Sequence, residues 1–319
     1  MSTHLEQNNS NKADTDVSHI DNPTISGSIY ITFLLLIGTS FLQFIFIIPL
    51  LINGMLTLEM FNLSQSEFGK AVGLHGESLL LLAELAALII CIKIAFKSKN
   101  IPLNTLGFKL KGYKVDALIG AFIGIVVIAT CFGLLTSTGY ITFTVQKFTL
   151  VPWLASCSLF LLVAIVEEVL CRGFIQNLLM RATSPYVALI ISSIIFMALH
   201  LGNDNWTLIS LLNLALAGVT FGLYYLHTKN LWFPIALHFT WNFFQGPVFG
   251  FEVSGHKMES WIAITRTNNS LITGGEFGLE GSILVTVFEI LMITLIHFKF
   301  TCSQINPNNK KMLPPLSPS

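Results

Sequence analysis

Long, unbroken apolar runs divide the chain into segments of similar length. They cover approximately residues 29–52, 79–96, 115–136, 151–170, 187–199, 208–226, 231–248 and 283–298. Most reach or approach the roughly 20 residues that an α-helix needs to cross about 30 Å of hydrocarbon. Because the runs are continuous rather than alternating, and because backbone amides in lipid must pair within their own segment, the pattern predicts helices and not barrel strands. We therefore expect an all-α, polytopic membrane helical bundle with about eight transmembrane helices.

Composition and charge agree with this pattern. Hydrophobic residues make up 53% of the 319 residues and charged residues only 11%, whereas soluble domains carry about 25% charged residues. Membrane lipid is the expected partner of most of the surface. Seventeen Lys and Arg balance seventeen Asp and Glu, so net charge gives no reason to expect a nucleic-acid partner. The five cysteines lie without paired spacing in or beside apolar runs, so neither disulfides nor a cysteine zinc site is predicted.

The basic residues indicate an orientation. They crowd one loop, which contains Lys97, Lys99, Lys109, Lys111 and Lys114. If this loop is cytoplasmic and the runs alternate in direction, most other lysines and arginines also face the cytoplasm. We expect an integral membrane protein of a bacterial cell membrane with both termini cytoplasmic.

The polar ends of the chain set the expected domain boundaries. Residues 1–28 are polar and lack the basic start and early apolar core of a cleaved signal, so we expect a disordered tail before a retained first helix. A transmembrane bundle is expected at 29–300. Residues 301–319 are expected to form a C-terminal tail.

The fourth run contains three ionisable side chains within six residues. Each costs about 2.5–3.5 kcal/mol at the centre of a membrane helix on insertion scales, so the cluster needs an explanation. Glu168 and Arg172 are four residues apart and are predicted to pair on one helix face. Glu167 points about 100° away from Glu168, towards a polar interior where a free carboxylate can act as a base. The alternative is that all three residues form only an ion-pair network at the helix end.

The fifth run ends with an aromatic ring and an imidazole one turn apart, Phe196 and His200. A lone histidine at such a place is more often structural than functional. However, Thr183-Ser184-Pro185 has the N-cap and N1 pattern of a helix start. Equal rise along both arms of an antiparallel hairpin that turns there puts Glu167 and His200 at the same depth, where they can share one water. The polar segment 202–205 must then border a water-filled cavity.

The seventh run supplies His238 and Asn242, one turn apart on one helix face. Amide hydrolysis needs a carboxylate that activates water, a histidine that shares its proton, and donors to a developing oxyanion, and this residue set provides them. Glu167, His200 and His238 also form a conventional ligand set for a catalytic Zn²⁺, with the fourth position left for water. The residues alone leave the metal-free and the zinc versions open.

The three motifs together form a recognisable pattern. Glu-Glu-x-x-x-Arg begins at Glu167, Phe-x-x-x-His at Phe196 and His-x-x-x-Asn at His238, each on a successive or neighbouring apolar segment. This order resembles the CPBP family (CAAX protease and bacteriocin-processing, also called Abi) of intramembrane proteases, over about residues 151–245. The family includes type II CAAX prenyl endopeptidases, which remove a C-terminal tripeptide after a prenylated cysteine, and bacterial relatives linked to bacteriocin immunity or peptide processing.

The resemblance implies roles for the residues. Glu167 would be the base for water, with His200 beside it, and His238 with Asn242 would stabilise the oxyanion. Glu168, Arg172 and Phe196 would support the site. The implied substrate is a peptide or a prenylated protein, and the implied cofactor is either Zn²⁺ or none.

Two other functions remain open from the sequence. A proton-coupled transporter would use Glu84 and Glu289 as further intramembrane carboxylates, although we expect both to be packing groups with satisfied polar atoms. A non-catalytic bacteriocin-immunity protein would keep the fold without the reaction, but the complete set of candidate catalytic residues argues against such a loss.

Overall fold

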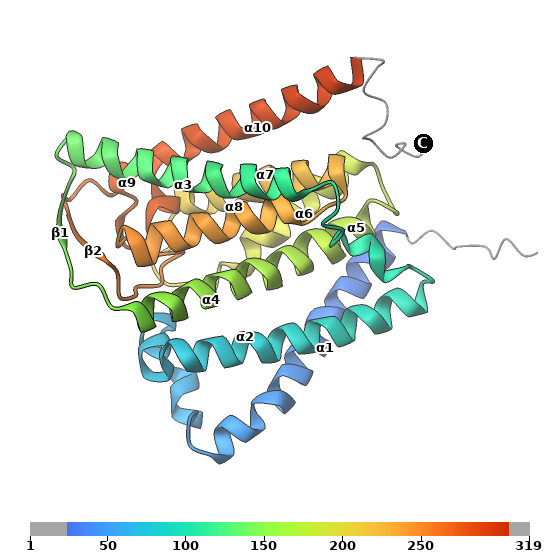
Figure 1. Ribbon diagram of the computed structural model, residues 1–319. Helices are drawn as coiled ribbons and strands as arrows, with labels where there is room; N and C mark the ends of the chain where they lie inside the picture. The colour runs from blue at the N-terminus through green and yellow to red at the C-terminus, as the bar shows by residue number, and fades with distance from the viewer. Residues whose placement is uncertain (1–23, 306–319) are drawn as a thin grey trace, which may run out of the picture.

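Helices account for nearly all of the regular structure in the computed structural model, which describes residues 24–305 (Figure 1). Each predicted apolar run lies on a helix, and the all-α prediction is confirmed. These helices are α1 (Ile25–Ile52), α2 (Gln65–Ser98), α3 (Lys114–Ser137), α4 (Leu150–Glu168), α6 (Pro185–Leu199), α7 (Leu208–Thr228), α8 (Trp232–Phe243) and α10 (Ile283–Ile305). The short helices α5 (Asn177–Leu179) and α9 (Ser270–Thr273) complete the α-helical set of the described chain.

The predicted membrane bundle is confirmed, but the count of eight spans is not. Among the described residues, six helices are long and apolar enough to cross a membrane, including α4 together with its continuation to Leu179. Helix α6 has 15 residues and α8 has 12, although α8 continues as a π-helix over Phe244–Val248. His200 directly follows α6, and His238 lies in the middle of α8.

The helices differ in how much of their surface faces the rest of the protein. Only 17% of the apolar window of α1 is buried inside the bundle, compared with 56% for α7. Large apolar side chains of the outer helices, such as Phe41 on α1, Phe122 on α3 and Phe298 on α10, are exposed. Because no polar partner covers them, these faces are suited to lipid. Helices α4 and α7 form the centre of the bundle.

Side-chain caps explain where the first two helices begin. Thr24 accepts a hydrogen bond from the Gly27 amide and starts α1 at Ile25, four residues before the predicted apolar run. The predicted tail at 1–28 thus lies almost entirely outside the described residues, as does most of 301–319. Ser64 and Glu67 form a capping box that starts α2 well before its apolar part.

Two glycines let α3 pack closely against α8. A side chain at Gly120 would place its Cβ 2.5 Å from the Phe233 carbonyl oxygen, and at Gly124 it would lie 2.9 Å from that of Leu237. The Gly120 and Gly124 pair therefore serves packing within the chain. This contact holds one face of α8 against α3 and leaves the face with His238 and Asn242 for the interior.

A small sheet was not predicted. Strands β1 (Ile141–Val145) and β2 (Ile262–Arg266) pair antiparallel, with Phe143 opposite Ile264. They connect the segment before α4 to the polar loop before α10, at the end of the bundle opposite to the start of α1 and the end of α10 (Figure 1). An ion pair between Glu252 and Arg266 joins β2 to the chain that follows α8.

Candidate active site

Helix α4 presents the acidic pair at the point where its geometry changes. The α-helix ends at Glu168 and continues as a π-helix over Val169–Gln176, a wider turn often found at functional sites. Arg172 Nη1 lies 2.9 Å from Glu168 Oε1, and both side chains are almost fully buried. The predicted pair is confirmed. Arg172 also donates through Nη2 to the Gly218 carbonyl on α7, at 3.2 Å.

Two aromatic rings, those of Phe196 and Phe221, pack against the guanidinium of Arg172. The guanidinium carbon of Arg172 lies 4.4 Å from the centre of the Phe196 ring and 5.0 Å from that of Phe221. Cation–π contacts of this kind are strongest where water is excluded. Phe221 also stacks on the imidazole of His238, with ring centres 5.2 Å apart and planes inclined by 13°. Phe221 was not predicted as a site residue, yet it touches two members of the predicted set.

His238 is oriented by the second glutamate. Its Nδ1 lies 3.1 Å from Glu168 Oε1, and the ring is buried. Because Glu168 also accepts from Arg172, its carboxylate is the acceptor and His238 Nδ1 is assigned as the donor. The other ring nitrogen, Nε2, then faces Glu167 Oε2 at 3.9 Å.

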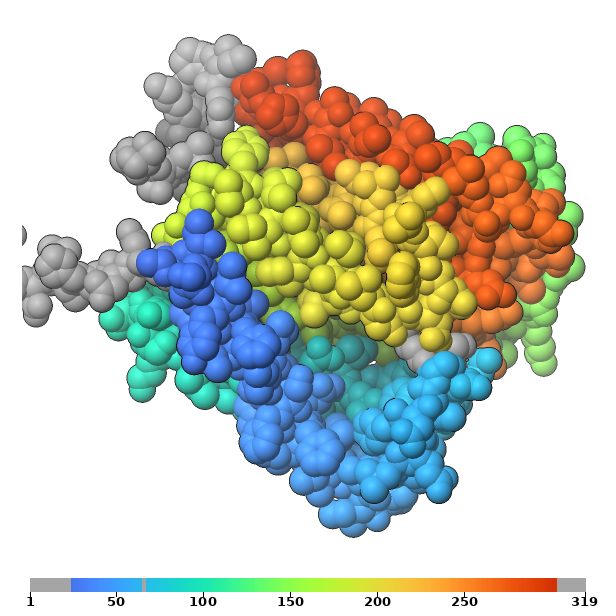
Figure 2. Space-filling model, turned by 180° about the vertical axis from the view of Figure 1, so that it is seen from behind, coloured from blue at the N-terminus to red at the C-terminus, as the bar shows by residue number. Residues whose placement is uncertain are grey.

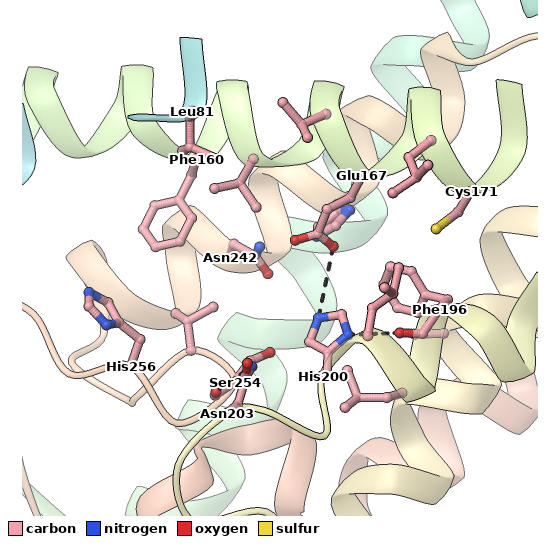
Figure 3. Close-up of a pocket in the computed structure, with 18 of the residues that line it drawn as sticks. Leu81, Phe160, Glu167, Cys171, Phe196, His200, Asn203, Asn242, Ser254 and His256 are labelled. Atoms are coloured by element: carbon pink, nitrogen blue, oxygen red, sulfur yellow. Dashed lines mark hydrogen bonds and ion pairs between the residues drawn. The ribbon is translucent and has the colours of Figure 1, made fainter. Parts of the chain in front are cut away.

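His200 is oriented by the backbone of its own helix. Its Nδ1 lies 2.8 Å from the Phe196 carbonyl oxygen. Since a carbonyl only accepts, Nδ1 is assigned as the donor, and Nε2 of the neutral ring is an acceptor. This Nε2 lies 3.8 Å from Glu167 Oε2. The hairpin prediction that Glu167 and His200 lie at the same depth is therefore confirmed (Figure 3).

Glu167 Oε2 is the point at which the two imidazoles converge. It is a buried oxygen without a hydrogen-bond partner, although the side chain as a whole is 31% exposed. Separations of 3.8 and 3.9 Å are too long for hydrogen bonds and suit groups bridged by a water. An unpaired carboxylate oxygen between two imidazoles has room for one small polar molecule.

These side chains open into one cavity with a volume of about 630 Å³. Helices α1, α2, α4, α6, α7, α8 and α10 contribute to its wall, and so does the chain around Ser254. Asn242 lines it together with Glu167 and His200 (Figure 3). Asn203 lines it too, and its Nδ2 donates to the Ser254 carbonyl at 3.0 Å. The prediction that segment 202–205 borders the cavity is thus confirmed through Asn203.

Further carboxyl groups reach the same cavity. Glu289 accepts a hydrogen bond from Thr220, in agreement with the expected packing role, but it also lines the cavity. Glu84 also lines it, without a hydrogen bond or ion pair to any described residue, so the packing role expected for Glu84 stays a prediction. Glu280 lies outside the spanning helices, and burial raises its pKa to about 7. Gln245 donates to it.

The carboxylate of Glu167 and the imidazoles of His200 and His238 lie farther apart than the ligands of one zinc ion. Two donors bound to one tetrahedral Zn²⁺ at about 2.0–2.2 Å lie about 3.3 Å apart. The Glu167 oxygen is 3.8 and 3.9 Å from the two imidazole nitrogens. Within residues 24–305, no group of three or more His, Cys, Asp or Glu side chains has the arrangement of a metal site. The side chains of Glu167, His200 and His238 as placed therefore do not fit a bound zinc.

Fold and site together define a class of protein: a membrane-spanning helical bundle in which a carboxyl, two imidazoles and a carboxamide meet in one cavity. Residues 147–244, about a third of the chain, match the family model described as "Type II CAAX prenyl endopeptidase Rce1-like". This match confirms the resemblance over residues 147–244, which are similar to this family of endopeptidases. No curated protein and no solved structure matches the chain.

Proposed function

We propose that the protein is an intramembrane endopeptidase that hydrolyses a peptide bond with a water activated by Glu167. The observation that carries the proposal is the unpaired, buried Oε2 of Glu167, which lies 3.8 and 3.9 Å from the Nε2 atoms of His200 and His238. A water in this space can donate one hydrogen bond to Glu167 and the other to His200, because both atoms are acceptors. Its oxygen lone pairs are then free to attack.

The reaction follows from this placement. The water oxygen attacks the carbonyl carbon of the scissile bond while Glu167 takes one of its protons as general base. The carbonyl oxygen becomes an oxyanion, to which the Asn242 amide donates from the same helix as His238. Glu167 then passes the proton to the amide nitrogen, the C–N bond breaks, and the products are a carboxylic acid and an amine. General-base catalysis of this kind is worth about 10²–10⁴ in rate.

The buried groups behind the site orient the two histidines. Glu168 holds Nδ1 of His238, and the Phe196 carbonyl holds Nδ1 of His200, so both Nε2 atoms point towards Glu167. Arg172 balances the charge of Glu168 at 2.9 Å. Preorganised donors of this type need no rearrangement when charge develops on the substrate.

The walls of the cavity support a lipid-modified substrate. Figure 2 shows a hollow in one face of the molecule, between the α1–α2 hairpin and the α6–α7 hairpin. Leucines of α1 and α2, among them Leu36, Leu80 and Leu88, line the cavity, and exposed apolar side chains such as Phe33 and Ile94 cover the outer faces of these helices. A prenyl chain can occupy such a wall while the adjoining peptide bond reaches Glu167. We therefore propose CAAX-type processing of a prenylated peptide rather than processing of an unmodified bacteriocin-like peptide.

The orientation in the membrane belongs to the same proposal. The lysine-rich segment 97–114 lies at the same end of the bundle as the start of α1 and the end of α10 (Figure 1). We propose that this end faces the cytoplasm, in keeping with the distribution of positive charge. Impermeant thiol labelling of single cysteines placed at 111 and at 268, in intact bacterial cells, tests it, because only position 268 should react.

The activity is tested with purified protein in liposomes and a farnesylated peptide ending in a CAAX sequence. Mass spectrometry should detect loss of the C-terminal tripeptide with the wild-type protein and none with Glu167→Gln. A peptide without the farnesyl group should be cleaved more slowly, and a chelator arm measures whether cleavage depends on a metal. Intact peptide after prolonged incubation with folded wild-type protein would contradict the proposed function.

A further inference from the structure

The cavity that holds the candidate active site has an unbalanced charge. The described residues that line it include glutamates and histidines but no lysine or arginine. The glutamates are Glu77, Glu84, Glu167, Glu280 and Glu289. The one arginine close to the site, Arg172, lies behind the wall and is already paired with Glu168. A substrate group that enters the cavity therefore meets carboxyl groups without a basic side chain to balance them.

Most of these carboxyls already have partners. Glu77 lies 3.3 Å from His256, Glu280 accepts from Gln245, and Glu289 accepts from Thr220. Glu167 is assigned to the attacking water. Glu84 remains, and it has neither a hydrogen bond nor an ion pair to any side chain or amide of the part of the chain that the structure describes. It lies in the cavity wall, where a group that enters the cavity can reach it.

Glu84 lines the same cavity as Glu167. Residues 77, 80, 81, 84 and 88 of α2 line the cavity and follow one face of the helix. Glu84 lies in the middle of this stripe. It interacts electrostatically with Glu167 on the neighbouring helix α4, and both carboxyls line one cavity. Helix α2 lies outside the segment that matches the protease family, so Glu84 is a feature of the flank and not of the shared motifs.

We propose that Glu84 determines specificity: it receives a cationic or hydrogen-bond-donating side chain of the substrate residue that follows the scissile bond, and it disfavours a carboxylate there. This inference rests on the proposed protease function and adds the charge class of the substrate. Like charges at contact distance are costly and an opposite charge is favourable, and more so where protein walls limit the access of water. Glu84 acts on substrate choice, whereas Glu167 acts on the water.

The test uses three farnesylated peptides that differ only in the residue directly after the farnesylated cysteine, which is Lys, Gln or Glu. Binding to the protein in nanodiscs is measured by fluorescence anisotropy, and cleavage is measured in parallel. Wild-type protein should bind the Lys peptide at least about tenfold more tightly than the Glu peptide, with the Gln peptide between them. In Glu84→Gln, the ratio between the Lys and Glu peptides should fall to within about threefold.

A matched control removes the same charge elsewhere. Glu59 is exposed in the 3₁₀ turn Leu58–Asn62, outside the cavity, so Glu59→Gln should keep the wild-type ratio. Equal binding of the Lys and Glu peptides by wild-type protein would overturn the inference, and so would an unchanged ratio in Glu84→Gln or no binding of any peptide. If the binding ratios are as expected but no peptide is cleaved, the specificity role of Glu84 is supported and the protease function is not.

Discussion

The buried pair of Glu168 and Arg172 gives a sharp prediction about stability and activity. The two side chains are 0% and 1% exposed and lie 2.9 Å apart. Replacing Glu168 with methionine leaves the guanidinium buried without its counter-charge, and loss of one partner of a buried pair costs about 3–5 kcal/mol. The Gly218 carbonyl and the rings of Phe196 and Phe221 compensate in part, so we expect Glu168→Met to lower the free energy of unfolding by about 3 kcal/mol.

The double variant Glu168→Met/Arg172→Met separates stability from function. It replaces both charges with apolar side chains of similar length, which is often neutral for stability, and a thioether between Phe196 and Phe221 makes favourable contacts. We expect it to regain at least about 2 kcal/mol relative to Glu168→Met. Cleavage should stay at least about tenfold below wild type, because nothing then holds Nδ1 of His238.

The assay is reversible unfolding in mixed micelles, followed by cleavage of the farnesylated peptide with each variant. Glu168→Gln is the matched control, because its amide oxygen can still accept from His238 while the charge is lost. A double variant as unstable as Glu168→Met would refute the claim that the unpaired cation causes the loss. A double variant with wild-type cleavage would refute the positioning role of Glu168.

Three further predictions follow from other contacts. Gly120→Leu should destabilise the protein by about 2 kcal/mol or more in the same unfolding assay, because its Cβ would lie 2.5 Å from the Phe233 carbonyl of α8. Phe221→Ala should lower kcat and destabilise the fold by about 3 kcal/mol, since the ring stacks on His238 and covers Arg172; a change in stability alone would contradict this. Burial raises the pKa of Glu280 from 4.5 to about 7, so the folded state retains a proton that the unfolded chain releases. Stability should therefore fall by about 1–3 kcal/mol between pH 4.5 and 7, and unfolding at pH 5 and 8 should show a smaller fall in Glu280→Gln.

The sequence was sufficient for those contacts that depend on local periodicity. The pair of Glu168 and Arg172 follows from i,i+4 spacing on one helix. The approach of Glu167 and His200 follows from equal rise along the two arms of a hairpin whose turn is marked by Ser184 and Pro185. Both predictions use only neighbouring segments, and regular helix geometry then leaves little freedom.

Contacts between distant segments could not be predicted in this way. Phe221 belongs to an apolar helix with several aromatic residues, and nothing in its spacing shows which of them stacks on His238. The sequence shows Glu84 as a charged residue in an apolar run. Whether its side chain reaches the cavity depends on how α2 is rotated about its axis relative to α4, which the sequence does not show. Strands β1 and β2 are only five residues long and are separated by more than a hundred residues, so neither had a local partner that would identify it.

The number of membrane-spanning helices also could not be predicted from the sequence. A helix needs about 20 residues to cross a bilayer, but α6 has only 15 residues and α8 has 12 before its π-helical continuation. Helix α6 ends at Leu199 because Gly202, Asn203 and Asp204 follow, and Asn203 turns to the cavity. Such short helices are tolerated where they line a polar cavity rather than lipid.

The measurement that tests the central claim most directly is the cleavage rate of Glu167→Gln beside wild type. The substitution keeps the shape of the side chain and removes the base, and unfolding curves of the two proteins show whether the fold is retained. The account predicts a folded protein whose kcat is reduced by about 10²-fold or more. A folded Glu167→Gln protein with a kcat within about threefold of wild type would contradict it.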